Sequence, residues 1–111
     1  MAIPKKLLEE ILADDFYQKC IRSHEGTCRG RVTFEHAIIY AGKQVQEKWA
    51  IVPLCEYHHD VLSFQDRGDL KKDYGQWVAL NRMTEADEKK YPKRNWKKER
   101  ELLNKKYGKE R

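Results

Sequence analysis

The stretch that decides the fold reads Ala50-Ile51-Val52-Pro53-Leu54-Cys55-Glu56-Tyr57-His58-His59. Its first half is apolar and β-branched, which predicts a short strand over residues 50–54. Pro53 places that strand at the edge of a sheet or marks its end, because proline cannot donate a ladder hydrogen bond. From Cys55 onward apolar residues recur at helical spacing, which predicts a helix over 55–65 that ends near Gly68. One cysteine and two histidines therefore lie where a strand passes into a helix.

The remaining cysteines and histidines lie close to this stretch. All three cysteines and all four histidines of the chain fall between residues 20 and 59. Structural zinc sites use thiolate and imidazole ligands in a closed tetrahedron. A chain of 111 residues builds only a modest core, and a metal ion is a common supplement to such a core. We predict one structural zinc ion bound by Cys20, Cys28, Cys55 and His58.

The spacing within the predicted zinc site leaves two alternatives open. Seven residues separate Cys20 from Cys28, more than the usual two to four between paired ligands, so the chain must loop out between them. Gly26 makes such a loop easier. His24 lies inside the loop and competes for the fourth ligand position. The second alternative is that the cysteines are buried free thiols and the histidines are unrelated surface residues.

The rest of the chain predicts an α+β protein. Residues 31–40 are rich in β-branched and aromatic residues, which predicts a strand that carries Glu35 and His36. An amphipathic helix is predicted over 4–15, a helix capped by Asp69 follows the central region, and Trp96, Leu103 and Tyr107 mark a basic helix over about 94–107. Between the last two helices, a short polar segment is expected. We expect one domain, 1–111, with its core at 20–65 and a helical basic part at 69–111.

Composition and charge narrow the functional classes. Apolar residues make up 40% of the chain and charged residues 37%, which is typical of a soluble globular protein. There is no apolar run of 18 residues, so no membrane span is expected, and Glu9 and Glu10 interrupt any secretory apolar stretch. We therefore expect a cytoplasmic protein, where structural disulfides are rare. The net charge of +5 is concentrated near the C-terminus, which indicates either a nucleic-acid partner or a solvated helix face.

Several motifs together resemble the HNH endonuclease family, in particular its small zinc-containing phage and prophage members. The motifs are Glu35-His36 on a strand, a second strand that ends in Val52-Pro53-Leu54-Cys55, and His58-His59 at the start of a helix. The resemblance covers about residues 20–65. It implies a ββα-metal core with a zinc knuckle, flanked by an N-terminal helix and C-terminal helices. In that family the zinc ligands brace the unit, and a second divalent ion takes part in hydrolysis.

The resemblance also implies residue roles. His36 matches the histidine that acts as general base on water, and Glu35 and His59 match the protein ligands of the catalytic ion. Histidine suits the first role because its ordinary titration range lies nearest to neutral pH. A cation beside the scissile phosphate stabilises the charge on its oxygens. Mg²⁺ or Mn²⁺ suits a carboxylate and an imidazole supplemented by water, and Ni²⁺ or Zn²⁺ could also bind.

The sequence departs from the family at one position. The family asparagine, which holds the general-base histidine through the backbone, would fall at Ala50. Gln44, Gln46 and Lys48 are candidates to replace it. The departure favours a second reading, a catalytically inactive zinc-binding module that binds DNA or a protein. Taken alone, Glu35 also fits an ordinary exposed strand residue, and His36 also fits a satisfied core histidine. A third reading is an unrelated zinc protein in which Glu35 and His59 are incidental.

The resemblance and the charge together point to DNA as the partner. The expected phosphate contacts are basic residues before the first strand, in the connecting loop and near the C-terminus: Arg29, Arg31, Lys43, Lys48, Lys89, Lys90, Lys93, Arg94, Lys97 and Lys98. A homodimer is left open, because so small a nuclease often needs two copies to cut both strands. The family also implies a phage or prophage protein acting in the cytoplasm of a bacterial host.

Overall fold

The computed structural model describes residues 3–61 and 69–108. Within them the elements, in chain order, are α1 (Lys5–Leu12), η1 (Asp15–Gln18), η2 (Ser23–Glu25), β1 (Val32–His36), β2 (Ile39–Tyr40), β3 (Lys43–Gln44), η3 (Lys48–Ala50), β4 (Ile51–Cys55), η4 (Tyr57–Val61), α3 (Asp69–Arg82), α4 (Glu85–Lys90) and α5 (Trp96–Tyr107). The η labels denote short helical turns. Helices and two small antiparallel sheets make the protein α+β, as the sequence predicts.

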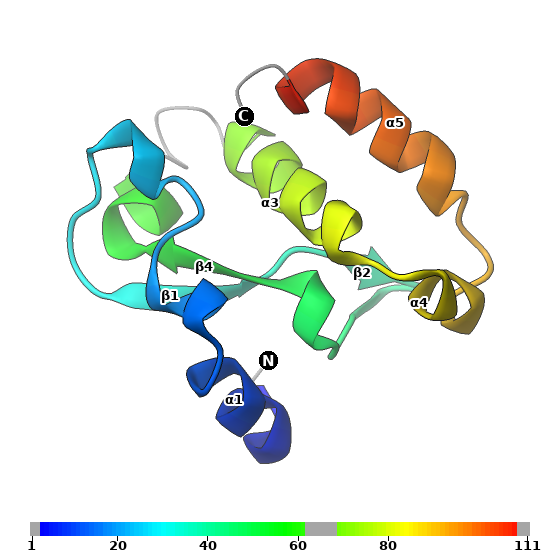
Figure 1. The fold of residues 1–111 in the computed structure, drawn as a ribbon, viewed down its shortest axis with the longest axis horizontal. Coiled ribbons are helices and arrows are strands. Elements are labelled where there is room, and N and C mark those ends of the chain that lie inside the picture. The colour runs from blue at the N-terminus through cyan, green and yellow to red at the C-terminus, as the bar shows by residue number, and fades with distance from the viewer. Residues whose placement is uncertain (1–2, 62–68, 109–111) are drawn as a thin grey trace.

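The central sheet consists of β1 and β4, which run antiparallel and cross the middle of the molecule (Figure 1). Glu35 is the cross-strand partner of Val52, and His36 is the partner of Ile51. All five residues of β4 are buried. On the side of β4 away from β1, the Pro53 carbonyl accepts a hydrogen bond from the Ile21 N–H at 2.9 Å. Within the described residues the sheet has only these two strands, so Pro53 lies on an edge strand, one of the two positions that the sequence allows.

The predicted single strand over 31–40 is wrong in one respect, because it divides after His36. The Ala37 N–H bonds the Ala50 carbonyl at 2.9 Å, and the chain then leaves the central sheet to pair β2 with β3. Ala41 and Gly42 form the two-residue turn of that hairpin, with φ of 52° and 79°. Two positive φ values give the turn the twist that joins antiparallel strands.

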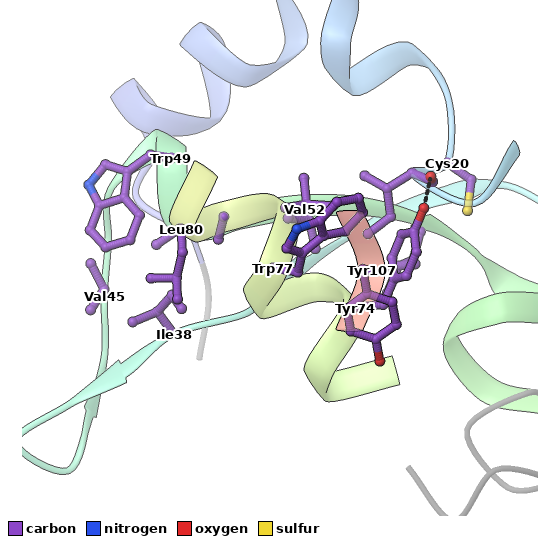
Figure 2. Close-up of a cluster of buried hydrophobic side chains, with 14 of the residues drawn as sticks. Cys20, Ile38, Val45, Trp49, Val52, Tyr74, Trp77, Leu80 and Tyr107 are labelled. Atoms are coloured by element: carbon purple, nitrogen blue, oxygen red, sulfur yellow. Dashed lines mark hydrogen bonds between the residues drawn. The ribbon is translucent and has the colours of Figure 1, made fainter. Parts of the chain in front are cut away.

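α3 lies between the central sheet and α5, and it contributes the largest share of the main core (Figure 1). Its buried face carries Tyr74, Trp77 and Val78, of which the last two lie three and four residues after the first and so share its side of the helix. Figure 2 shows Trp77 and Leu80 of α3 packed among buried residues of the sheet, the η3 turn and α5. The main hydrophobic cluster therefore joins the C-terminal helices to the sheet that carries the candidate site.

The N-terminal helix is shorter than predicted, and the chain behind it is held by polar contacts. α1 ends at Leu12 rather than 15, since Asp14 is extended and accepts a hydrogen bond from the Phe16 N–H. Tyr17 is buried and donates its hydroxyl proton toward backbone carbonyls at Lys48 and Ile51, while Arg82 donates to the hydroxyl oxygen at 2.9 Å. These contacts fix the segment that leads into Cys20.

The described C-terminal part, residues 69–108, holds three helices, α3, α4 and α5. α4 forms the short polar segment expected between the two longer helices, and it starts there because Thr84 and Asp87 cap each other's backbone N–H groups. α5 begins at Trp96 after Asn95, whose side chain accepts from the Lys98 N–H at 3.1 Å. The predicted helix 55–65 is present as the short turn η4, and its end near Gly68 lies outside the described residues. Over 3–61 and 69–108, no helix has the length and apolar character needed to cross a membrane.

Candidate metal centre and active site

The structure brings together the four residues predicted to hold zinc. The ligand atoms of Cys20, Cys28, Cys55 and His58 all lie within 4.8 Å of one another. The sulfurs of Cys20, Cys28 and Cys55 are 3.4, 3.6 and 3.1 Å from the His58 Nδ1 atom. Around a tetrahedral zinc, a sulfur and a nitrogen ligand are about 3.5 Å apart. The donor set and its spacing therefore fit one zinc ion.

Each half of the group is positioned by a local backbone turn. Cys20 and Cys28 flank the η2 turn, and Gly26 closes that turn at φ 72°, a left-handed conformation that glycine adopts without strain. Cys55 ends β4 and His58 lies in the first turn of η4. The backbone N–H groups of Arg22 and His58 point at the sulfurs of Cys20 and Cys55, at 3.4 and 3.5 Å. N–H donors of this kind stabilise thiolates.

The two halves meet through the segment that precedes β1. The Glu56 N–H bonds the Arg31 carbonyl at 2.9 Å, and the Tyr57 N–H bonds the Arg29 carbonyl at 3.1 Å. Gly30 lies between these contacts at φ 80°, and a Cβ there would be only 2.9 Å from the Glu56 Cβ. The close approach thus requires glycine at position 30 and keeps Cys28 beside the end of β4.

His58 is the fourth member, and Thr27 contacts the ring nitrogen that faces away from the sulfurs. His58 is fully buried, and its Nε2 lies 3.1 Å from the Thr27 hydroxyl oxygen. When Nε2 donates its proton to Thr27, Nδ1 keeps a free lone pair directed at the three sulfurs. The sequence does not reveal this contact, whose only signal is that Thr27 adjoins Cys28. His24 lies outside the group and stacks near Tyr74, so the rival fourth ligand is not among the clustered residues.

The protonation of the three thiols shows why a cation suits the group. Burial raises the pKa of Cys20, and it raises the pKa of Cys28 to about 12. Cys28 is exposed as a residue, but its sulfur lies against the other ligand atoms. At Cys55 burial also raises the pKa, yet hydrogen bonds from the backbone N–H groups of His58 and Arg29 and from the other two thiols together bring the pKa below its ordinary value. A divalent cation supplies the charge that stabilises all three thiolates together.

Next to this group, the structure pairs Glu35 with His59. The Glu35 Oε2 atom is 2.6 Å from the His59 Nε2 atom, and the two side chains are about one-third exposed, at 29% and 33%. His59 directly follows the clustered His58, and Glu35 is held by the pairing of β1 with β4. Two cis ligands of one Mg²⁺ ion lie about 3.0 Å apart, so a small opening of the pair would admit a hard cation.

His36 follows Glu35 and is held by a glutamine. The His36 Nε2 atom is 2.9 Å from the Gln46 Oε1 atom, so Nε2–H donates to the amide oxygen. Among the residues that the structure describes, Nδ1 of His36 has no hydrogen-bond partner, which leaves it able to accept a proton. Of the three candidates for the role of the family asparagine, Gln46 makes this contact, whereas Lys48 pairs with Asp14 at 2.6 Å.

Comparisons of the chain with models of protein families, with curated proteins and with solved structures returned no match. The site must therefore be interpreted from its own residues. What the geometry defines is a Cys₃His group with zinc-type spacing, adjoining a partly exposed carboxylate–imidazole pair and a histidine with one free ring nitrogen.

Proposed function

We propose that this protein is a metal-dependent endonuclease of the HNH type that hydrolyses phosphodiester bonds in DNA. The observation that carries the proposal is the contact of 2.6 Å between Glu35 and His59, which are 24 residues apart in the chain. The pair is partly exposed, and His36 lies beside it as a third titratable side chain. The carboxylate and the imidazole of the pair are suitable ligands for a catalytic divalent ion.

The arrangement around the pair supports the ββα-metal interpretation. β1, β4 and η4 follow in the order strand, strand, helical turn, and the Cys₃His group ties the far end of β4 to the loop before β1. Zinc in this group is structural in the proposal, because four protein ligands leave no open position for substrate or water. It holds His58 in place, and thereby the neighbouring His59 next to Glu35.

His36 acts as the general base in the proposed reaction. Its Nδ1 atom takes a proton from the attacking water, while Gln46 accepts the Nε2 proton and fixes the ring orientation. A divalent ion bound by Glu35 and His59, Mg²⁺ or Mn²⁺ with Ni²⁺ or Zn²⁺ as further candidates, would supply positive charge for the phosphate oxygens. The proposal thus gives each of the three side chains a separate role.

The absence of the family asparagine at position 50 is compensated in part. Ala50 is fully buried and its carbonyl accepts a hydrogen bond from the N–H of Ala37, the residue after His36. This backbone link supports the end of β1 without an amide side chain at position 50. Gln46 supplies a side-chain contact to the histidine itself.

Ala50 also favours a second candidate function. If the Gln46 contact does not replace the asparagine, the chain is a catalytically inactive zinc-binding module that binds DNA or a protein partner. The phosphate-binding residues are the same in both proposals. Arg29, Lys43, Lys89, Lys93, Lys97 and Lys98 are exposed and form no ion pair within the described part of the chain, whereas Lys90 pairs with Glu47 and Arg94 with Glu99.

A nicking assay separates the two functions. Supercoiled plasmid is incubated with the protein and Mg²⁺, Mn²⁺ or Ni²⁺, and His36→Ala and His24→Ala are tested beside it. We expect nicking by the wild type and by His24→Ala, since His24 lies outside the site, and loss of at least about 100-fold in rate for His36→Ala. Absence of nicking with every metal, or equal nicking by His36→Ala, would refute the enzymatic proposal.

A further inference from the structure

A cavity of about 290 Å³ lies between the central sheet and α3, and the proposed catalytic residues Glu35 and His36 border it. Val52 and Leu54 of β4 line it from the sheet. Since cross-strand partners project to the same face, Glu35 shares the face of the sheet that carries Val52. The cavity therefore begins at the proposed catalytic site and extends toward α3.

The chemistry of the walls favours a small neutral ligand. Apolar side chains from β4 are combined with the amide side chains of Gln44 and Gln76, and the Gln44 Oε1 atom is buried with no hydrogen-bond partner in the described residues. Arg94 also borders the cavity, but its guanidinium is neutralised by Glu99 and lies over the Trp96 ring. The other charged residue of the lining, Glu35, pairs with His59, so neither charge is left to attract an anion such as phosphate. The cavity volume of about 290 Å³ lies just below the usual range for ligand sites, which begins at about 300 Å³, so only a small ligand fits.

Gly75 of α3 gives an independent indication that the cavity is kept open. Glycine is unfavourable inside a helix, and neither positive φ nor a clash explains it here. A Cβ at position 75 would meet Val52 Cγ2 at 3.6 Å and Ala37 Cβ at 3.7 Å, which are ordinary contacts. Alanine would fit and would favour the helix. Gly75 forms part of the cavity wall, so a side chain at this position would reduce the space in the cavity.

We propose that this cavity receives one unstacked nucleobase adjacent to the phosphate that is cut. The inference rests on the proposed nuclease function and names its substrate class: DNA in which a base at the cleavage position is unpaired, as in a bulge, flap or branch. A flat neutral heterocycle suits apolar walls, and amide side chains can hydrogen-bond the base edge that is freed from pairing. A base in a continuous duplex cannot enter without paying for unpairing and unstacking.

Nucleotide binding tests the cavity without any requirement for cleavage. The four deoxynucleoside 5′-monophosphates are titrated to about 10 mM in an NMR experiment on the zinc-loaded protein without added Mg²⁺ or Mn²⁺. The control, 2-deoxyribose 5-phosphate, lacks a base. At least one nucleotide is expected to shift the side-chain amide signals of Gln44 and Gln76 and the backbone signal of Gly75. No shift with any nucleotide, or equal shifts with the sugar phosphate, would overturn the proposal.

Substitutions at Gly75 separate binding from folding. Gly75→Ala is expected to raise the thermal midpoint by about 2–6 °C while weakening nucleotide binding, and Gly75→Leu is expected to abolish binding. Gly108→Ala is the matched control, because Gly108 has nothing within 4 Å of its Cβ position and lies at the end of α5. Unchanged nucleotide binding in a folded Gly75→Ala or Gly75→Leu protein would contradict the assignment.

Cleavage then tests the substrate class. On matched oligonucleotides, the wild type and Gly108→Ala are expected to cut a duplex with a one-base bulge at least 10-fold faster than the fully paired duplex. Equal rates on the two substrates would overturn the inference but leave the nuclease proposal intact. If the protein binds nucleotides at the cavity but cuts neither substrate, the nuclease proposal is refuted. The proposed role of the bound base in cleavage is then refuted with it.

Discussion

Among single residues, Thr27 and Gln46 are alike in that each contacts one ring nitrogen of a histidine in the site. The Gln46 amide oxygen accepts from Nε2 of His36, which leaves Nδ1 as the base. The Thr27 hydroxyl lies beside Nε2 of His58 and accepts its proton when Nδ1 binds the metal. Both side chains therefore position a histidine without binding metal or substrate themselves.

Thr27→Val tests the first of these contacts. Valine has nearly the same shape but cannot accept the Nε2 proton, so we expect zinc affinity to fall by about 10-fold while the stoichiometry at saturation is unchanged. Competition with a chelating dye measures the affinity. Thr33→Val is the matched control, since the Thr33 hydroxyl bonds the Leu54 carbonyl in the central sheet. An equal change in both variants would mean that Thr27 has no specific effect on the metal.

If the protein is a nuclease, substitutions of Gln46 test whether its hydrogen bond orients His36 as the general base. Gln46→Leu removes the acceptor and is expected to lower kcat by about 10- to 100-fold with little change in KM, because His36 loses its orientation and not its contact with DNA. Gln46→Glu keeps an acceptor at the same distance and should retain most of the activity. If the leucine and glutamate variants were equally impaired, the hydrogen bond would have no role in positioning.

At the scale of elements, the β2–β3 hairpin departs most clearly from local preference. Its turn needs positive φ at two successive positions, and one of them is Ala41, at φ 52°. Alanine pays a steric cost in this conformation that asparagine largely avoids. The hairpin holds Gln44 and precedes Gln46, so its geometry bears on both the cavity and His36.

Ala41→Asn is therefore expected to stabilise the protein by about 0.5–1 kcal/mol, a rise of about 2–6 °C in the thermal unfolding midpoint. Ala86→Asn provides a control of opposite sign, because Ala86 lies within α4, where asparagine is a weaker helix former than alanine. Thermal unfolding followed by circular dichroism measures both. A lower midpoint for Ala41→Asn would contradict the turn assignment.

Local sequence pattern predicts some of these elements and misses others. The strand at 50–54, the helix from 69 and the four clustered ligands follow from local pattern and residue chemistry, and the structure contains each of them. The division of the predicted strand 31–40 was not predictable, because it arises from tertiary pairing of Ala37 with Ala50. The Gln46 contact depends likewise on where the hairpin folds back.

At the scale of the whole molecule, charge is distributed unevenly over the fold. Residues 88–111 hold 11 basic and 4 acidic residues, a net charge of +7, whereas 1–87 hold 12 basic and 14 acidic residues, a net charge of −2. α5 carries exposed lysines and lies at the opposite end of the molecule from α1 (Figure 1). A basic surface on α5 favours binding of an anionic polymer that extends from α5 across α3 toward the central sheet.

Double substitution of Lys97 and Lys98 by glutamine tests this surface. We expect weaker DNA binding and a slope of log affinity against log salt that is smaller by about one unit for each lysine that contacts a phosphate. Lys5 and Lys6 on α1 are also exposed, and the same double substitution there is the matched control. Fluorescence anisotropy with a labelled duplex over a salt series gives both quantities. Equal losses in the two variants would indicate only a general charge effect.

Cys20, Cys28, Cys55 and His58 are expected to bind one zinc ion that holds the site together, and metal analysis of the purified protein measures this binding. Protein purified without added metal should contain one zinc per chain, with His24→Ala unchanged and His58→Ala largely depleted. Chelation should also lower the thermal midpoint, because binding to a folded site stabilises the fold. A zinc content well below one per chain in the wild type, or equal contents in the two variants, would contradict the account.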